Sequence, residues 1–167
     1  TVTLVAVSKT KPNTDILAAY SSGQRIFGEN KVQELVKKQE ELPKDIQWHM
    51  IGHLQRNKVK FIAPFIALIH GVDNLKLLQE IDKRAAQNNR KIDCLLQIHI
   101  AKEDTKFGFE IHEIKEVLLA TSSFKNISII GLMGMATFTD DTNQIKEEFK
   151  SLKTVFDSIK NNKITTL

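Results

Sequence analysis

Short apolar runs alternate with segments of helical period along the whole chain. The apolar runs predict strands at residues 2–8, 25–28, 46–51, 66–72, 92–100 and 127–132, and the start of a seventh strand at 164–167. Between them lie six segments whose apolar residues recur at spacings of three and four, which is typical of helices. This alternation predicts right-handed βαβ units, and therefore a parallel sheet covered by helices.

The apolar stripes of the helices indicate the faces that pack on the sheet. The clearest stripe consists of Ile145, Phe149, Leu152, Phe156 and Ile159, with lysines and glutamates on the opposite face. We expect this whole stripe to lie on the sheet. Two further helices repeat the arrangement, one with Val32, Leu35, Val36 and Leu42 and the other with Leu78, Ile81 and Ala85.

The number of repeats favours a barrel over an open sheet. Six βα units and the start of a seventh strand fall short of a (β/α)₈ barrel, which closes with eight strands over about 250 residues. We therefore predict one α/β domain over residues 1–167, a TIM-type barrel that lacks its N-terminal helix and its last strands. The alternative is an open doubly wound sheet, but its phosphate loop normally carries several glycines, whereas residues 8–14 contain none.

Composition narrows the class of protein only slightly. The net charge of +4 arises from lysines and arginines scattered among acidic residues, so it does not indicate a nucleic-acid partner. The one cysteine, Cys94, lies in an apolar run, which excludes disulfides and cysteine-based metal sites and fits a reducing compartment. No apolar run reaches the roughly 18 residues of a membrane span, so we expect no membrane partner and a cytoplasmic location.

Both architectures place ligands at the carboxyl ends of their strands, and these ends are polar here. Lys9 follows a nearly all-apolar strand and shares side-chain parity with Val5 and Val7. If that face lines the barrel, partial desolvation lowers the pKa of the amine, and the neutral amine can form a Schiff base with a carbonyl group. The alternative is a lysine that reaches water at the strand tip, and strand position alone favours this alternative.

A second polar cluster lies at the end of the strand predicted at 46–51. His49, Gly52 and His53 stand where a strand meets the first turn of a helix, and backbone N–H groups there can bind an anion or a polar ring substituent. Two histidines four residues apart form a metal pair only when both lie on one helix, and His49 is still in the strand. We therefore predict no metal site, and we expect Trp48 and Met50 to pack outward into the core.

Six segments occur in the order and at the spacing of a known family: AVSKTKP, GQRIFGENKVQE, WHMIGHLQRNK, HGVDNLKLL, KEDTKFGF and GLMGMA. From about Thr3 to Leu167 the chain resembles the pyridoxal phosphate homeostasis proteins, the single-domain relatives of the alanine racemase N-terminal barrel. The resemblance implies that Lys9 holds pyridoxal 5′-phosphate (PLP) as a Schiff base. It also implies that the cofactor pocket is lined by Asn30, His49, Gly52 and Met133.

The chain departs from the family pattern at two positions inside the matched segments and at its end. His53 stands where several relatives carry proline, and His99 where many carry asparagine. Members of the family continue beyond the position of Leu167 with the segments that hold the cofactor's phosphate. We therefore expect the phosphate-binding residues to lie beyond Leu167.

Three functions from different classes follow. The resemblance implies a PLP carrier that serves intracellular vitamin B6 homeostasis with little or no catalysis, and PLP-dependent apo-enzymes are candidate recipients. A PLP-dependent racemase is the alternative, but it needs two positioned acid–base groups. In alanine racemases the second group is a tyrosine from a separate domain, whereas this chain has one tyrosine, Tyr20, on the first helix. A cofactor-free Schiff-base aldolase is the third possibility.

Overall fold

The computed structural model describes residues 2–103, 107–161 and 164–167. Its strands form one sheet in the order β1-β2-β3-β4-β5-β6, in which every neighbouring pair is parallel. This is the sheet that consecutive βα units predict, and it confirms the parallel α/β fold. The strands are β1 (Ala6–Val7), β2 (Ile26–Glu29), β3 (Gln47–Met50), β4 (Leu68–Val72), β5 (Ile92–Ile98) and β6 (Ile127–Gly134).

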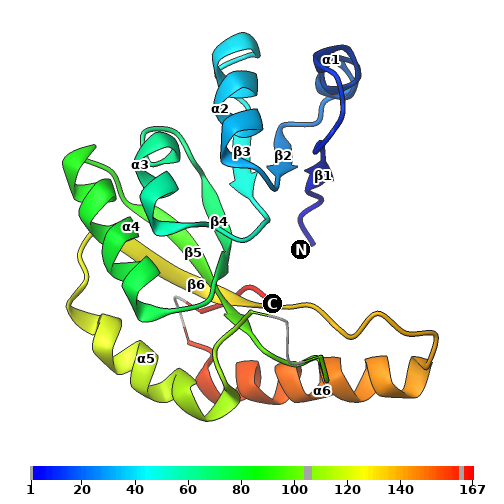
Figure 1. The fold of residues 1–167 in the computed structure, drawn as a ribbon, viewed down its shortest axis with the longest axis vertical. Coiled ribbons are helices and arrows are strands. Elements are labelled where there is room, and N and C mark those ends of the chain that lie inside the picture. Colours follow the sequence, from blue (N-terminus) through cyan, green and yellow to red (C-terminus); the bar gives the residue numbers. More distant parts are fainter. Residues whose placement is uncertain (1, 104–106, 162–163) are drawn as a thin grey trace.

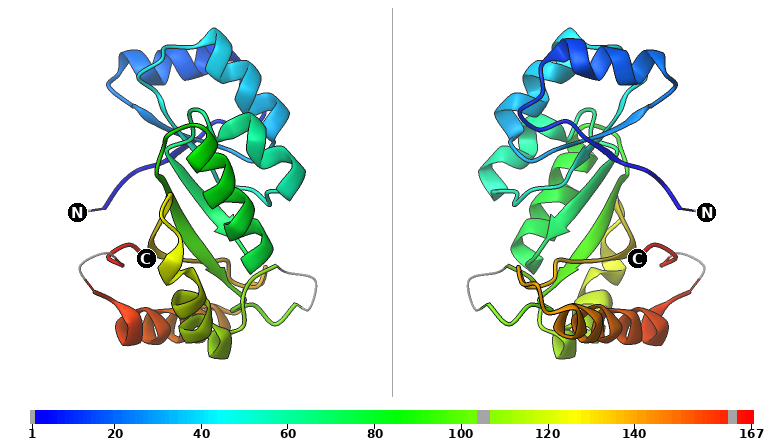
Figure 2. Two further views of the ribbon diagram at one scale, coloured as in Figure 1. Left: turned by 90° about the vertical axis from the view of Figure 1, so that its left-hand side faces the viewer. Right: turned by 90° about the vertical axis from the view of Figure 1, so that its right-hand side faces the viewer.

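The helices follow one another around the outside of the curled sheet, and both chain ends lie on the side that the helices leave uncovered (Figures 1 and 2). They are α1 (Asn13–Ser21), α2 (Val32–Glu41), α3 (Val59–Ile62), α4 (Leu75–Gln87), α5 (Ile114–Ala120) and α6 (Thr142–Ile159), with 3₁₀ turns at Arg56–Lys58, Ile111–Glu113 and Thr121–Ser123. Among the described residues, no helix combines the length and the apolar character that crossing a membrane requires.

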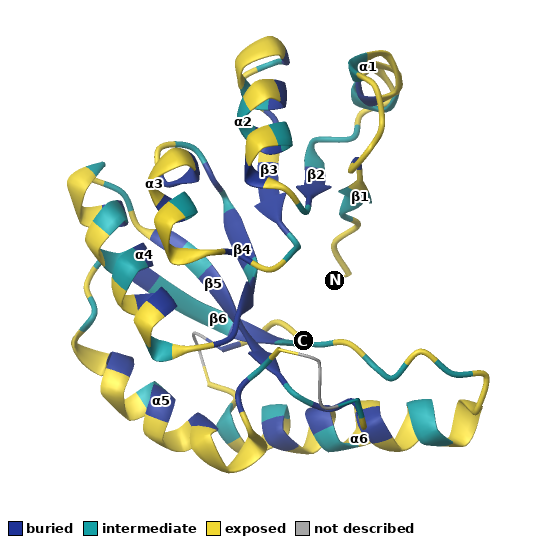
Figure 3. Ribbon diagram, in the orientation of Figure 1, coloured by how far each residue is buried: buried dark blue, intermediate teal, exposed yellow. Residues whose placement is uncertain are grey.

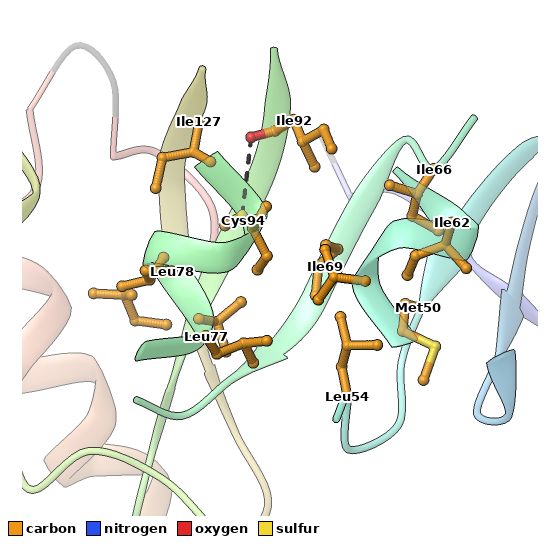
Figure 4. Packing of buried hydrophobic residues seen from close by; sticks show 14 of the residues in the cluster. Met50, Leu54, Ile62, Ile66, Ile69, Leu77, Leu78, Ile92, Cys94 and Ile127 are labelled. Atoms are coloured by element: carbon orange, nitrogen blue, oxygen red, sulfur yellow. Dashed lines mark hydrogen bonds between the residues drawn. The ribbon is translucent and has the colours of Figure 1, made fainter. Parts of the chain in front are cut away.

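The hydrophobic core lies between the sheet and the surrounding helices. Side chains of β3, β4 and β5 point outward and meet the inner faces of α3 and α4, as Figure 4 illustrates for Met50, Ile69 and Cys94. Figure 3, coloured by burial, shows that the strands are mostly buried and that the helices are buried only on the side that faces the sheet. Trp48 and Met50 are almost fully buried, which confirms that both pack outward. Cys94 is fully buried, and burial raises the pKa of its thiol, so it behaves as a small hydrophobic residue.

Two of the three predicted helical stripes are confirmed, and the third is wrong at one position. Leu35 on α2 and Leu78 on α4 are completely buried, whereas Phe149 on α6 is 45% exposed. The buried face of α6 instead includes Glu148, whose carboxylate accepts hydrogen bonds from the backbone N–H and the hydroxyl of Thr137 at 2.7 and 2.6 Å. Because Glu148 occupies the buried position, its neighbour Phe149 turns toward solvent.

The first strand is shorter than predicted. Only Ala6 and Val7 pair with β2, although the sequence pattern predicts a strand over residues 2–8. Within the described chain β1 has a neighbour on one side only, and Val2 and Leu4 are 97% and 74% exposed. The apolar side chains of residues 2–5 therefore lack cover in the described chain, because burial of an apolar strand requires packing on both sides.

The chain returns to the sheet at its last residues. Thr166 forms a parallel bridge with Gly131, and the Leu132 N–H donates to the Thr166 carbonyl at 3.0 Å. A Cβ atom at position 131 would lie 1.9 Å from that carbonyl oxygen, so only glycine permits this approach. This isolated bridge places residues 164–167 beside β6, where the sequence predicts the start of a seventh strand, but it does not itself form a strand. The described strands therefore have the parallel, helix-covered arrangement of a TIM-type barrel, which is not closed between β1 and this segment.

Candidate functional site

Side-chain alternation along the strands separates the helix-covered face from the inner face of the curled sheet. Trp48 and Met50 are buried under helices, so His49 between them faces inward. Leu132 is buried on the outer face of β6, which leaves Met133 on the inner face in register with Gln97 of β5. Residues predicted for the cofactor pocket therefore share one face of the sheet.

Lys9 lies in the turn that directly follows β1. Ser8 before it is buried on the helix-covered side, where its hydroxyl contacts Glu29, and Val7 on the opposite face of β1 is exposed. The Lys9 side chain is exposed and has no hydrogen-bond or ion-pair partner among the residues that the structure describes. The expected desolvation of the amine is not found, because β1 lies at an open edge of the described sheet.

The backbone on either side of Lys9 is held by a buried ion network. The Lys38 ammonium of α2 donates to the Ser8 carbonyl, to Glu29 Oε1 and to Glu34 Oε1, each at 2.7 Å. The Ser8 hydroxyl donates to Glu29 Oε1 at 2.6 Å, and the Thr10 N–H donates to Glu34 Oε1 at 2.8 Å. Glu29 and Lys38 are 0% and 5% exposed. The Lys9 turn is thus tied to both β2 and α2.

Sequence reasoning missed this network, although the sequence contains a signal for it. Lys38 lies three residues after Leu35 and four before Leu42, which places it on the buried stripe of its helix. A lysine at such a position requires a buried acceptor, since burial of an unpaired charge is strongly unfavourable. Glu34, one turn earlier, is spaced for an ion pair with Lys38.

Asn30 and Gly52, both predicted pocket residues, are brought into direct contact by the ends of β2 and β3. A Cβ atom at position 52 would lie 2.6 Å from the Asn30 carbonyl oxygen, so any larger residue would push the two strand ends apart. The Asn30 side-chain oxygen is buried and has no hydrogen-bond partner among the described residues. Such an atom is a vacant acceptor at the edge of the inner face.

His49 forms a pair with His70 of β4. Its Nδ1 atom lies 3.0 Å from His70 Nε2, and the ring centroids are 5.1 Å apart. Burial, and to a lesser extent the charge of His70, lowers the pKa of His49 from 6.5 to about 4, while burial also lowers the pKa of His70. Both rings are therefore neutral at pH 7, and one donates its N–H to the other.

The register of β3 and β4 brings His70 to His49, because His49 pairs with Leu68 and His70 lies two residues further along β4. The register between β4 and β5 shifts between Ile69 and Val72, and both of these residues are fully buried on the outer face. The two residues between them, His70 and Gly71, consequently lie toward the inner face. The bulge therefore keeps Val72 on the outer face together with Ile69, whereas strict alternation would have placed Gly71 outward and Val72 inward.

The other histidine of the second polar cluster points elsewhere. His53 Nδ1 lies 3.0 Å from Asp73 Oδ2, and the His53 ring stacks on Phe107 with centroids 4.1 Å apart. His49 and His53 thus have different partners. In the described part of the chain, no group of three or more His, Cys, Asp or Glu side chains is arranged to hold a metal ion.

Comparison with known proteins shows which family this chain is similar to. A family model described as the N-terminal domain of alanine racemase matches residues 1–167. The pyridoxal phosphate homeostasis protein of Aquifex aeolicus is 37% identical over 157 residues, which are 93% of this chain and 69% of that protein. The protein of the same name from Helicobacter pylori is 39% identical over 171 residues, covering 99% of this chain and 76% of that protein.

A solved structure with similar sequence and fold contains a ligand. PipY of Synechococcus elongatus, solved with PLP bound, superposes with a TM-score of 0.82 at 34% identity, covering 92% of this chain and 72% of that one.

Proposed function

The chain belongs to the alanine racemase N-terminal domain family and, within it, to the pyridoxal phosphate homeostasis proteins, and from this premise we propose that it binds PLP on Lys9. We further propose that it serves intracellular PLP homeostasis in the cytoplasm as a carrier, with little or no catalysis and with PLP-dependent apo-enzymes as recipients. The observation that carries the proposal is the exposed, unpartnered Lys9 amine at the carboxyl end of β1.

The chemistry of the surrounding side chains fits a ligand with an aldehyde and a polar aromatic ring. PLP supplies an aldehyde, and a neutral lysine amine can add to its carbon with release of the carbonyl oxygen as water. The buried Asn30 oxygen without a partner can accept a hydrogen bond from a ring substituent. The neutral His49 ring can donate or accept a hydrogen bond without adding a positive charge to the inner face of the sheet.

The position of Tyr20 supports a carrier over a racemase. A racemase removes the substrate's Cα proton on one face and replaces it from the other, so it needs two positioned acid–base groups. Tyr20 lies on α1, outside the sheet, and its hydroxyl donates to Asp45 at 2.7 Å. Tyr20 is therefore engaged in the helix layer. The similarity to PLP homeostasis proteins disfavours a cofactor-free aldolase.

Absorbance spectroscopy tests the binding proposal. Addition of PLP to the chain should produce a Schiff-base band in the visible region, and Lys9→Ala should abolish it. Lys11→Ala is the matched control, because Lys11 is exposed two residues further on and should leave the band intact. A band that persists in Lys9→Ala and vanishes in Lys11→Ala would assign the cofactor to Lys11 and overturn the proposal. Incubation of the loaded chain with single amino acid enantiomers should give no racemisation.

A further inference from the structure

The turn that carries Lys9 has a conformation that depends on its surroundings. Thr10 has a φ of +64°, in the left-handed region, which is unfavourable for a β-branched residue. The Lys11 N–H donates to the Ser8 carbonyl at 3.0 Å and closes the turn. Such a conformation persists only where neighbouring groups fix it.

Glu34 provides the contact at the strained residue. Its Oε1 atom accepts the Thr10 N–H at 2.8 Å and the Lys38 ammonium at 2.7 Å. The hydrogen bond from Lys38 is the main reason why the pKa of Glu34 is lowered, so the carboxylate is ionised at neutral pH. Lys38 also donates to the Ser8 carbonyl, so one buried ammonium stabilises both ends of the turn.

We propose that Glu34 is a positioning residue for Lys9: it fixes the Thr10 backbone, with Lys38 holding the carboxylate in place, and so orients the Lys9 amine toward an incoming aldehyde. The inference rests on the proposed function, since it concerns the same amine. Glu34 itself acts only through the backbone. Removal of its carboxylate should leave the turn free to relax toward negative φ, with the Lys9 side chain in a different direction.

Glu34→Ala is the appropriate variant, because it removes the acceptor of Thr10 while Lys38 keeps its buried partner Glu29. Glu34→Gln retains a side-chain carbonyl oxygen for the same N–H and serves as the rescue variant. Glu40→Ala is the matched control, because Glu40 lies on the exposed side of the same helix and the substitution changes the charge equally. The measured quantities are the rate of Schiff-base formation with PLP and the hydrogen exchange of the Thr10 amide in the unloaded chain.

We expect Glu34→Ala to slow Schiff-base formation roughly 10- to 100-fold, as misplacement of a reacting group does, and to accelerate exchange of the Thr10 amide. Glu34→Gln should restore most of the rate of Schiff-base formation and most of the protection of the Thr10 amide from exchange. Glu40→Ala should change neither of these quantities. An unchanged rate in Glu34→Ala beside a reactive parent chain would overturn this inference and leave the proposed function standing. A slower rate with unchanged Thr10 exchange would overturn it as well, because the effect would then not pass through the Thr10 backbone. A parent chain that forms no Schiff base at all would overturn the proposed function and this inference with it.

Discussion

His49 Nδ1 lies 3.0 Å from His70 Nε2, so two imidazole rings from adjacent strands share one hydrogen bond on the inner face of the sheet. The contact exists because His49 pairs with Leu68, so His70, two residues further along β4, lies on the same face of the adjacent strand. Each ring is desolvated, and protonation of either would place a charge beside its neighbour. The pair therefore supplies a neutral polar wall near the strand ends where we propose that the cofactor binds.

The neutral His49 ring predicts a pH-dependent stability. The pKa of His49 falls from 6.5 to about 4 on folding, so the unfolded chain binds more protons between these values. The free energy of unfolding should therefore be fully retained above pH 6.5 and decrease as the pH falls toward 4. The contribution is about 2 kcal/mol, allowing for partial solvation of the ring. Urea denaturation at pH 7.5 and pH 4.5 measures it.

Two histidine variants test whether His49 causes this pH dependence of the free energy of unfolding. His49→Gln should reduce the difference in unfolding free energy between the two pH values by most of that amount. His112→Gln, at an exposed position in the 3₁₀ turn before α5, should leave the difference unchanged. Equal slopes for the parent chain and His49→Gln would show that the histidine pair does not control the acid sensitivity.

Gly52→Ala should destabilise the fold and weaken PLP binding together. The added Cβ would lie 2.6 Å from the Asn30 carbonyl oxygen and 2.8 Å from its Cα, and a backbone neighbour cannot move aside as a side chain can. We expect a loss of about 1–3 kcal/mol in the free energy of unfolding. Gly28→Ala is the graded control, because its Cβ would meet mainly the flexible Ile51 side chain at 3.1 Å. Equal losses in the two variants would contradict the close approach at Gly52.

The buried ion network predicts a large cost for the loss of its cation. Lys38→Met would leave the fully buried Glu29 carboxylate without its ammonium partner, and such substitutions cost about 3–5 kcal/mol. Lys37→Met removes an exposed ammonium whose ion pair with Glu41 is 4.0 Å long, so it should cost less than about 0.5 kcal/mol. Chemical denaturation of both variants gives the comparison. Similar stabilities of the two variants would contradict a stabilising role for the buried ion pair between Lys38 and Glu29.

Much of the fold could be predicted from hydrophobic periodicity, because burial against the sheet controls both the strands and the helices. The stripes through Leu35 and Leu78 identified buried faces correctly, and the segment 164–167, predicted as the start of a strand, forms a bridge with β6. The pattern failed at Phe149, where hydrogen bonds from Thr137 make the neighbouring Glu148 the better buried residue. It failed again at Val2 and Leu4, since an apolar sequence does not report which strand lies at an edge.

The candidate site could be predicted only in part. Asn30 and Gly52 were both predicted to line the cofactor pocket, and the structure places these two residues in contact. The partner of His49 depends on the register between β3 and β4, and the support of Lys9 depends on contacts between a strand, a turn and a helix that are far apart in sequence. Such tertiary contacts have no local periodic signature, although the lysine at position 38 on an apolar stripe was a visible hint.

The Lys9 amine is the group that we propose holds PLP, and chemical trapping identifies that group directly. Borohydride reduction converts a Schiff base into a stable secondary amine, so peptide mass spectrometry can then identify the modified lysine. At PLP concentrations equal to that of the chain, we predict that the phosphopyridoxyl mass appears on the peptide containing Lys9 and that Lys9→Ala loses it. Labelling spread evenly over exposed lysines such as Lys11, Lys31 and Lys37, with no preference for Lys9, would contradict this assignment.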